Sequence, residues 1–149
     1  MSDYFRLRFT VEGVPELSRI LFGEMKKVEN LKEPLQIAAR YIRQDVETNF
    51  ITEGGLVGGW APLTDSTIRG RERGGWGAHP ILQRSGALRR SFYSLVDEKK
   101  AIISSSSPYF VYHQSRQPRT RLPRRAMLVL VENTRQNIVE AFHKFLRFK

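Results

Sequence analysis

One stripe of apolar side chains constrains the fold of this chain more than any other feature. From residue 35 the apolar residues recur three or four positions apart, which is the spacing of one face of a helix. Pro34 suits the first turn of such a helix, and Gly54 and Gly55 would end it. The spacing therefore predicts a helix from 34 to about 53 with one buried face, formed by Leu35, Ala38, Ala39, Ile42, Val46 and Phe50.

The remaining patterns predict a small sheet and several shorter helices. Alternation of apolar and polar residues over 4–11 indicates a half-buried strand. A hairpin is predicted from a strand at about 91–97, a turn, and a strand at about 101–106. Further helices are predicted at about 15–29, 66–72, 86–89 and 109–114, and from 124 or 133 to 147. This order predicts an α+β fold, with a small antiparallel sheet packed against helices and with long basic and glycine-rich loops.

The stretch FITEGGLVGGWAPLTDST, residues 50–67, joins four closely spaced glycines to a tryptophan. Glycine lets a chain turn sharply or stay loose, whereas tryptophan buries a large rigid face. Two alternatives follow: Trp60 fills the core of its own chain, or the glycines let it reach a pocket on a neighbouring molecule. Thr64 or Asp65 is predicted to cap the helix that follows.

The length favours one domain over 1–149. Two stretches, at about 53–80 and 115–125, are longer than the connections usual in compact domains. We expect both of these stretches to be flexible loops.

Positive charge is concentrated in the same two loops. The 25 lysines and arginines exceed the 15 acidic residues by ten. Between Arg69 and Arg90 the only acid is Glu72, and 116–125 holds five arginines and no acid. These runs are either solvated loops or arms that become ordered against a partner. Nucleic acid, an acidic protein and an acidic neighbouring copy all remain open as that partner.

Several kinds of chemistry find no support in the sequence. The chain has no cysteine, and His79, His113 and His143 stand alone without the spacing of a zinc site. Neither G-x-S-x-G nor a phosphate-binding loop is present, and no apolar run approaches the length of a membrane span. We therefore expect no enzyme, no cofactor, no metal and no membrane contact. A structural or interaction protein and a basic nucleic-acid-binding protein remain.

Four short motifs follow one another along the chain. They are Gly59-Trp60-Ala61-Pro62-Leu63, Ile81-Leu82-Gln83-Arg84-Ser85-Gly86-Ala87-Leu88-Arg89-Arg90-Ser91, Tyr112-His113-Gln114, and Pro123-Arg124-Arg125-Ala126-Met127-Leu128. Read in order, they resemble those of the phage virion morphogenesis, or tail completion, family of Mu-like tailed phages. They also resemble the related head–tail joining and tail completion proteins of lambdoid phages, and the resemblance covers roughly residues 35–130.

The resemblance implies a non-enzymatic virion part that acts late in assembly, at the neck or the head-facing end of the tail. It would assemble in the host cytoplasm as a ring, expected to be a hexamer, around the portal–tail axis. Its neighbours would be the portal or head–tail connector and the tail terminator, with non-specific contact to packaged DNA.

Aromatic residues and arginines carry much of the binding energy in protein interfaces. We therefore expect the two loops to supply the contact residues of such a ring. The residues expected at these contacts are Trp60, Pro62, Leu63, Arg69, Arg71, Trp76, Arg116, Arg119, Arg121, Arg124 and Arg125.

Overall fold

The computed structural model describes residues 7–10, 30–116 and 121–147. The chain divides into two compact units. Among the described residues, unit 1 contains 45–92, 105–116 and 121–129, and unit 2 contains 7–10, 30–44, 93–104 and 130–147. The predicted helix at 15–29 lies outside the described residues. A single domain over 1–149 and flexible loops at 53–80 and 115–125 stay predictions.

The helix predicted from the apolar stripe is confirmed as α2 (Lys32–Ile51). All six residues of the stripe are buried, because the helical period places them on one face. Glu33 puts a negative charge in the first turn, where it interacts favourably with the helix dipole. After α2 the chain passes through Glu53 and Gly54, which both have positive φ angles that a helix cannot contain.

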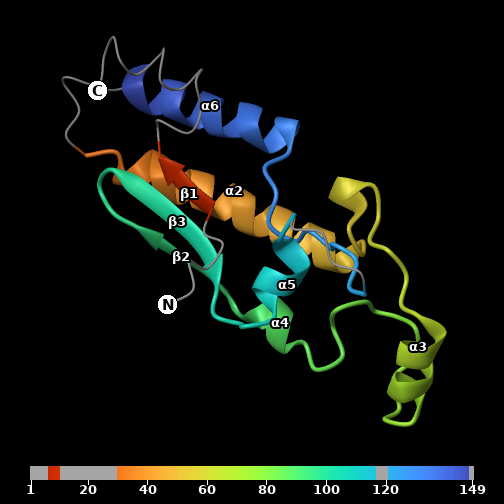
Figure 1. The fold of residues 1–149 in the computed structure, drawn as a ribbon. Helices are drawn as coiled ribbons and strands as arrows, with labels where there is room; N and C mark the ends of the chain where they lie inside the picture. Colours follow the sequence, from red (N-terminus) through yellow and green to blue (C-terminus); the bar gives the residue numbers. More distant parts are fainter. Residues whose placement is uncertain (1–6, 11–29, 117–120, 148–149) are drawn as a thin grey trace. The chain divides into compact units, whose positions relative to one another are not determined.

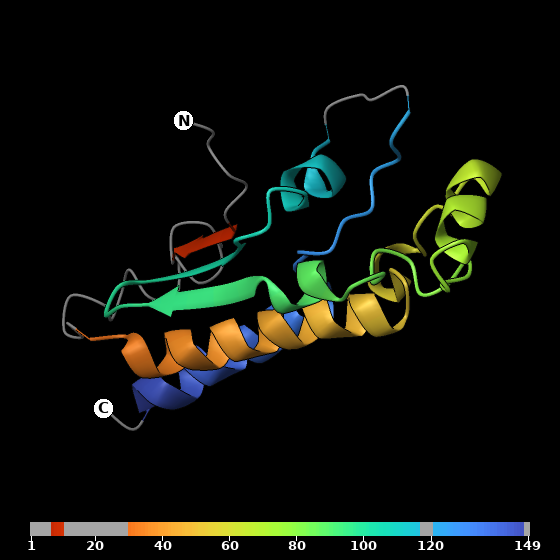
Figure 2. The same ribbon diagram turned by 90° about the horizontal axis from the view of Figure 1, so that it is seen from below.

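Unit 2 packs a small sheet and a second helix against the first part of α2. The sheet has the order β1-β3-β2, from β1 (Leu7–Thr10), β3 (Lys100–Ser105) and β2 (Phe92–Val96), and β1 runs antiparallel to β3 with Leu7 opposite Ile103. Figures 1 and 2 show α6 (Glu132–Arg147) running beside α2. Buried side chains from the helices and the sheet together form the core, which confirms the predicted α+β fold.

The turn between β2 and β3 is held by one carboxylate. Asp97 Oδ1 accepts hydrogen bonds from the backbone N–H groups of Lys99 and Lys100, both at 2.8 Å. The Asp97 N–H donates to the Lys100 carbonyl at 3.0 Å and closes the turn. The bond from Lys99, foremost, and the interactions with Lys100 lower the pKa of the Asp97 carboxyl below its ordinary value, although desolvation acts in the opposite direction.

We expect Asp97→Ala to lower the melting temperature slightly at neutral pH. Because the folded pKa is depressed, the stabilisation is present above the ordinary pKa of the carboxyl and is lost as the pH falls through the folded value. Thermal melts between neutral and acid pH should therefore show the gap from wild type narrowing on acidification. Glu98→Ala, in the same exposed turn, removes an equal charge without these bonds and should show no such gap. A gap independent of pH would contradict this account.

Unit 1 is built from short helices around a row of aromatic rings. Its elements are η3 (Gly55–Val57), α3 (Asp65–Glu72), α4 (Ala87–Arg90) and α5 (Phe110–Gln114). Phe50 packs edge-to-face on Trp60 and on Phe92, and Phe92 packs in the same way on Phe110, with ring centroids 5.3–5.9 Å apart. Edge-to-face geometry is favourable for aromatic pairs. Of the two predicted caps for α3, Thr64 is the one that accepts a hydrogen bond, from Thr67 N–H.

Candidate interaction surface

The glycine-rich segment of unit 1 turns back on itself through backbone hydrogen bonds. The Gly54 N–H donates to the Asn49 carbonyl at 2.7 Å, and the Trp60 N–H donates to the Glu53 carbonyl at 2.7 Å. Gly54 has φ +91°, and a Cβ there would overlap the Trp60 indole. Gly58 and Gly59 also have positive φ angles, which glycine adopts at little cost. The glycines therefore turn the chain back and place Trp60 against the end of α2.

Trp60 lies in the core of its own unit, with 7% of its surface exposed. Its Nε1 donates to the Ala126 carbonyl at 2.9 Å, and its ring packs on Phe50 with centroids 5.5 Å apart. Of the two alternatives raised by the sequence, the structure shows the first. The expectation that Trp60 contacts a neighbouring subunit is corrected, because its ring and its single donor are already satisfied within the chain.

A second buried side chain ties α5 to the segment after it. Gln114 Oε1 accepts from the backbone N–H groups of Met127 (3.0 Å) and Leu128 (3.1 Å), and Gln114 Nε2 donates to the Leu128 carbonyl at 2.7 Å. Asn49 completes the arrangement by donating to the Met127 carbonyl at 3.1 Å. Residues 126–128 belong to no helix or strand. The side chains of Gln114 and Asn49 therefore form the hydrogen bonds that a neighbouring strand would otherwise give to the backbone of Met127 and Leu128.

Arg125 belongs to this interior and not to an exposed arm. Only 4% of its surface is exposed. Nε donates to the Ala61 carbonyl at 2.8 Å, and Nη2 donates to the Pro62 carbonyl at 2.9 Å. Burial lowers the pKa of its guanidinium below the ordinary value. The expectation that Arg125 contacts a partner by way of a solvated loop is therefore corrected, because carbonyl groups of its own chain occupy two of its donors.

Arg71 is also buried, with 6% of its surface exposed, although its neighbours in α3 are polar and exposed. Its Nη2 donates to the Pro80 carbonyl at 3.0 Å, while its buried Nε has no hydrogen-bond partner in the described part of the chain. The structure therefore places Arg71 in the interior rather than in an exposed loop, and its predicted contact with a partner stays a prediction. The charge pattern alone does not reveal which arginines of a run are buried.

A groove of about 670 Å³ opens on unit 1, and we call it the unit 1 groove. It joins residues from the three helices α3, α4 and α5 and from the connecting segments. Its lining is Leu63, Thr64, Thr67, Arg71, Leu82, Arg84, Ser85, Ala87, Leu88, Ser91, Ser107, Pro108, Tyr109, His113, Arg121, Leu122, Pro123 and Arg125.

The predicted contact residues divide between this groove and the open surface. Leu63 and Arg121 line the groove, together with the buried Arg71 and Arg125. Trp60 is buried and lies outside the lining. Five further residues are exposed outside the groove: Pro62, Arg69, Trp76, Arg116 and Arg124. Arg119 lies outside the described residues.

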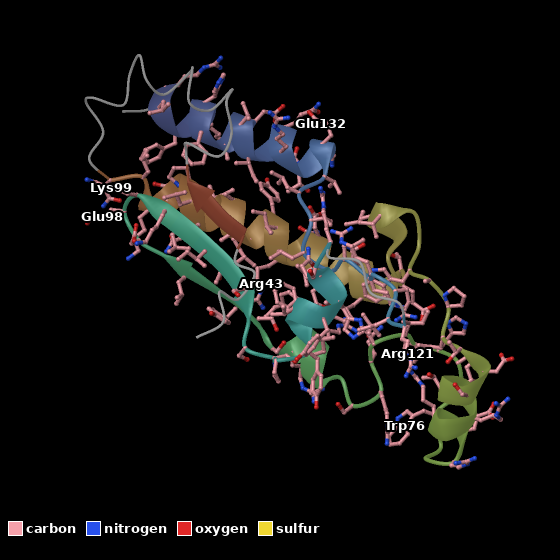
Figure 3. The ribbon with its side chains drawn as sticks, viewed as in Figure 1. Arg43, Trp76, Glu98, Lys99, Arg121 and Glu132 are labelled. Atoms are coloured by element: carbon pink, nitrogen blue, oxygen red, sulfur yellow. The ribbon has the colours of Figure 1, made fainter. Side chains whose placement is uncertain are left out.

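Figure 3 labels two of the predicted contact residues, Trp76 and Arg121. Trp76 is 38% exposed, and the guanidinium carbon of Arg84 lies 4.8 Å from its ring centroid, within the range of a cation–π contact. Arg84 and Tyr109 also line the groove, although neither was among the contact residues predicted from the sequence. Tyr109 is among the most exposed large apolar residues described, and its position next to Pro108 gave no sign of that.

A model of the phage virion morphogenesis family matches residues 14–147. The chain belongs to this family. Comparison with curated proteins and with solved structures gave no match. Membership confirms the resemblance seen in the four motifs and indicates a role in the morphogenesis of a phage virion.

In this virion morphogenesis protein, three of the four motifs meet in unit 1. We call their meeting point the motif junction and define it as residues 60–62, 113–114 and 124–128. Besides the contacts above, the Arg125 N–H donates to the His113 carbonyl at 2.9 Å, and Arg124 Nε donates to the Gln114 carbonyl at 3.1 Å. The remaining motif supplies Leu82, Arg84 and Leu88 to the groove. Residues far apart in the chain thus act as one hydrogen-bonded cluster.

The described side chains offer no assembled metal site. Within 7–10, 30–116 and 121–147, no three histidine, cysteine or acidic residues come together in a way that could hold a metal ion. His79 Nδ1 and Glu53 Oε2 lie 2.6 Å apart, and Glu53 Oε1 accepts from the Ile81 N–H, so this pair braces the loop before the groove. None of the helices among the described residues is both long and apolar enough to cross a membrane.

We expect Arg125→Ala to reduce the free energy of unfolding by about 2 kcal/mol, because two carbonyl groups lose a charged donor and a buried stem is removed. Arg124→Ala should cost about 0.5 kcal/mol or less, since Arg124 is exposed and makes one side-chain bond. Urea unfolding of both variants measures the difference. Equal losses would contradict the assignment of Arg125 to the interior.

Proposed function

We propose that this protein is a structural, non-enzymatic virion component that completes the neck or tail and takes part in head–tail joining. It assembles in the host cytoplasm as a ring of copies, expected to be a hexamer, around the portal–tail axis. The observation that carries the proposal is the family match, which spans residues 14–147. In its place in the particle, the protein contacts the portal or head–tail connector on one side and the tail terminator on the other.

The described surface supports a role in assembly. A large groove on unit 1 combines leucines with arginines, and aromatic and arginine side chains are the types that dominate interface energies. Trp76, Arg69 and Arg116 remain exposed outside that groove and are available for contacts between copies. A ring formed through head-to-tail contacts uses two different faces of each copy, and it closes when the rotation between neighbours permits.

Loss of the gene tests this function directly. Negative-stain images of particles made without the protein should show separate heads and tails, and supply of the wild-type protein should restore joined virions. The purified protein, imaged alone and with isolated tails, should show rings. Normal, infectious particles in the absence of the protein would overturn the proposal.

Positive charge supports a second candidate, a basic nucleic-acid-binding protein. The net charge is +10, and Arg69, Arg73, Arg116, Arg121 and Arg124 are all exposed. Such a protein would bind duplex DNA as an isolated molecule, and its affinity would fall steeply with salt because phosphate contacts release counterions. Titration of a labelled duplex with the protein at several salt concentrations separates the two candidates. A nucleic-acid-binding protein should bind the duplex by itself, whereas a joining protein should bind other virion proteins.

A further inference from the structure

The unit 1 groove joins an apolar surface to a strong positive charge. Leu63, Leu82 and Leu88 give it apolar contact area, and Arg84 and Arg121 stand exposed in its lining. The lining contains no aspartate or glutamate. A concave site with apolar walls and a few charged groups is the ordinary form of a ligand or peptide site.

Two further cations in the lining have no acidic partner. Arg71 and Arg125 are more than nine-tenths buried, and neither pairs with a carboxylate in the part of the chain that the structure describes. The buried Arg71 Nε also lacks a hydrogen-bond partner there. A buried charge without a counter-charge is costly, so an anionic group seated in the groove would relieve that cost. This observation indicates a negatively charged occupant.

The charge of the whole molecule argues against a second copy as that occupant. The chain has only 15 acidic residues against 25 lysines and arginines, so it is itself a poor source of a segment rich in aspartates and glutamates. The leucines favour a polypeptide over duplex DNA, because DNA presents phosphates outward and offers the groove no apolar side chain to bury. A segment with large apolar residues beside aspartates or glutamates matches both the walls and the charge.

We propose that the unit 1 groove binds an acidic segment of a different protein, with its carboxylates at the exposed Arg84 and Arg121, where they also offset the charge of the buried Arg71, and its apolar side chains on the leucines. The inference deepens the proposed function, because it gives the chemistry by which a neighbouring virion protein is recognised, and it rests on that function only for the source of the partner. Charge complementarity of this kind determines the choice of partner and the rate of encounter.

Binding of model peptides to the whole purified protein tests the proposal. The probe is a fluorescein-labelled peptide of about a dozen residues in which glutamates flank leucines, followed by fluorescence anisotropy at physiological salt. Matched peptides replace glutamate by glutamine or by lysine, and a labelled DNA duplex is the nucleic-acid arm. We expect the glutamate peptide to bind at least about tenfold more tightly than the glutamine peptide, a difference of about 1.4 kcal/mol.

Substitutions in and away from the groove locate the binding. The variant Arg84→Gln with Arg121→Gln should weaken the glutamate peptide about tenfold or more. Arg40→Gln with Arg73→Gln removes the same charge at exposed positions outside the lining and should change binding less than about threefold. Replacing both groove arginines by glutamate should reverse the preference, so that the lysine peptide binds. Circular dichroism and melting temperature verify that each variant is folded.

Three outcomes would overturn the proposal. The first is that the glutamate peptide shows no saturable binding at concentrations up to about 1 mM. The second is an equal loss of peptide affinity in the groove double variant and in the distant double variant, which would mean that the peptide is attracted by the net charge of the protein and not by the groove. The third is that the duplex binds more tightly than the peptide and loses affinity in the groove pair, which would make the groove a nucleic-acid site. A negative result in the peptide experiment does not change the expected phenotype of the gene deletion. Failure of the groove proposal can therefore be told apart from failure of the proposed function.

Discussion

Replacing Trp60 by alanine is expected to reduce the free energy of unfolding by about 3–5 kcal/mol. The substitution removes a buried indole, its edge-to-face contact with Phe50 and its hydrogen bond to Ala126. For a chain of this length such a loss lowers the melting temperature by about 10 °C or more. Chemical unfolding and thermal melting of the variant measure it. This expectation follows from the first of the two alternatives that the sequence left open for Trp60, in which the ring fills the core of its own chain.

Trp76→Ala is the matched control, because it removes the same side chain from an exposed position. Trp76 contacts Arg84 but is 38% exposed, so we expect it to cost about 1 kcal/mol or less. A Trp60→Phe variant should fall between the two, since it keeps most of the packing and loses the N–H donor. If Trp60→Ala melted with the wild type while preventing assembly, Trp60 would serve the interface after all.

Replacing Gln114 by alanine is expected to cost about 3 kcal/mol. The Gln114 amide forms hydrogen bonds with three backbone groups of Met127 and Leu128. Alanine would leave these two N–H donors and one carbonyl buried without that partner. An unsatisfied buried polar group is more costly than the net gain from forming its bond. Urea unfolding should show a lower midpoint with an unchanged slope.

Two further variants distinguish the effect of these hydrogen bonds from the effect of removing a glutamine side chain. Gln136→Ala on α6 removes an exposed amide with one long bond to Glu132, and it should change stability by about 0.5 kcal/mol or less. Gln114→Glu keeps the acceptor for both N–H groups but loses the donor to the Leu128 carbonyl. Relative to wild type at the same pH, this variant should recover stability in acid, where a protonated carboxyl can donate. A Gln114→Ala variant as stable as wild type would refute the role of the junction.

The elements that were predicted correctly are those whose signal lies within the element itself. The stripe from Leu35 to Phe50 predicted α2, and two strand segments on either side of the Asp97 turn predicted the hairpin. Two candidate caps, Thr64 and Asp65, predicted the start of α3. Each of these depends on contacts or backbone preferences over a few residues, so a linear pattern carries them.

The placements that were missed depend on partners far away in the sequence. Trp60 donates to a carbonyl 66 positions later, and Arg125 bonds carbonyls 63 and 64 positions earlier. Backbone carbonyls have no sequence signature, so an arginine that binds them looks the same as a solvated one. For the same reason the run 116–125 read as uniformly exposed, although Arg125 is buried while Arg116, Arg121 and Arg124 are exposed.

The motif junction has a consequence during synthesis on the ribosome. Trp60 leaves the ribosome well before its hydrogen-bond acceptor at Ala126, which is translated 66 residues later. At about 5–20 residues per second, that interval is about 3–13 s. During this interval the segment that covers the Trp60 indole has not yet been made, so the indole is accessible to chaperones or to the Trp60 of another nascent chain. Slow translation of the segment between them should therefore increase aggregation of this protein more than slow translation of α6.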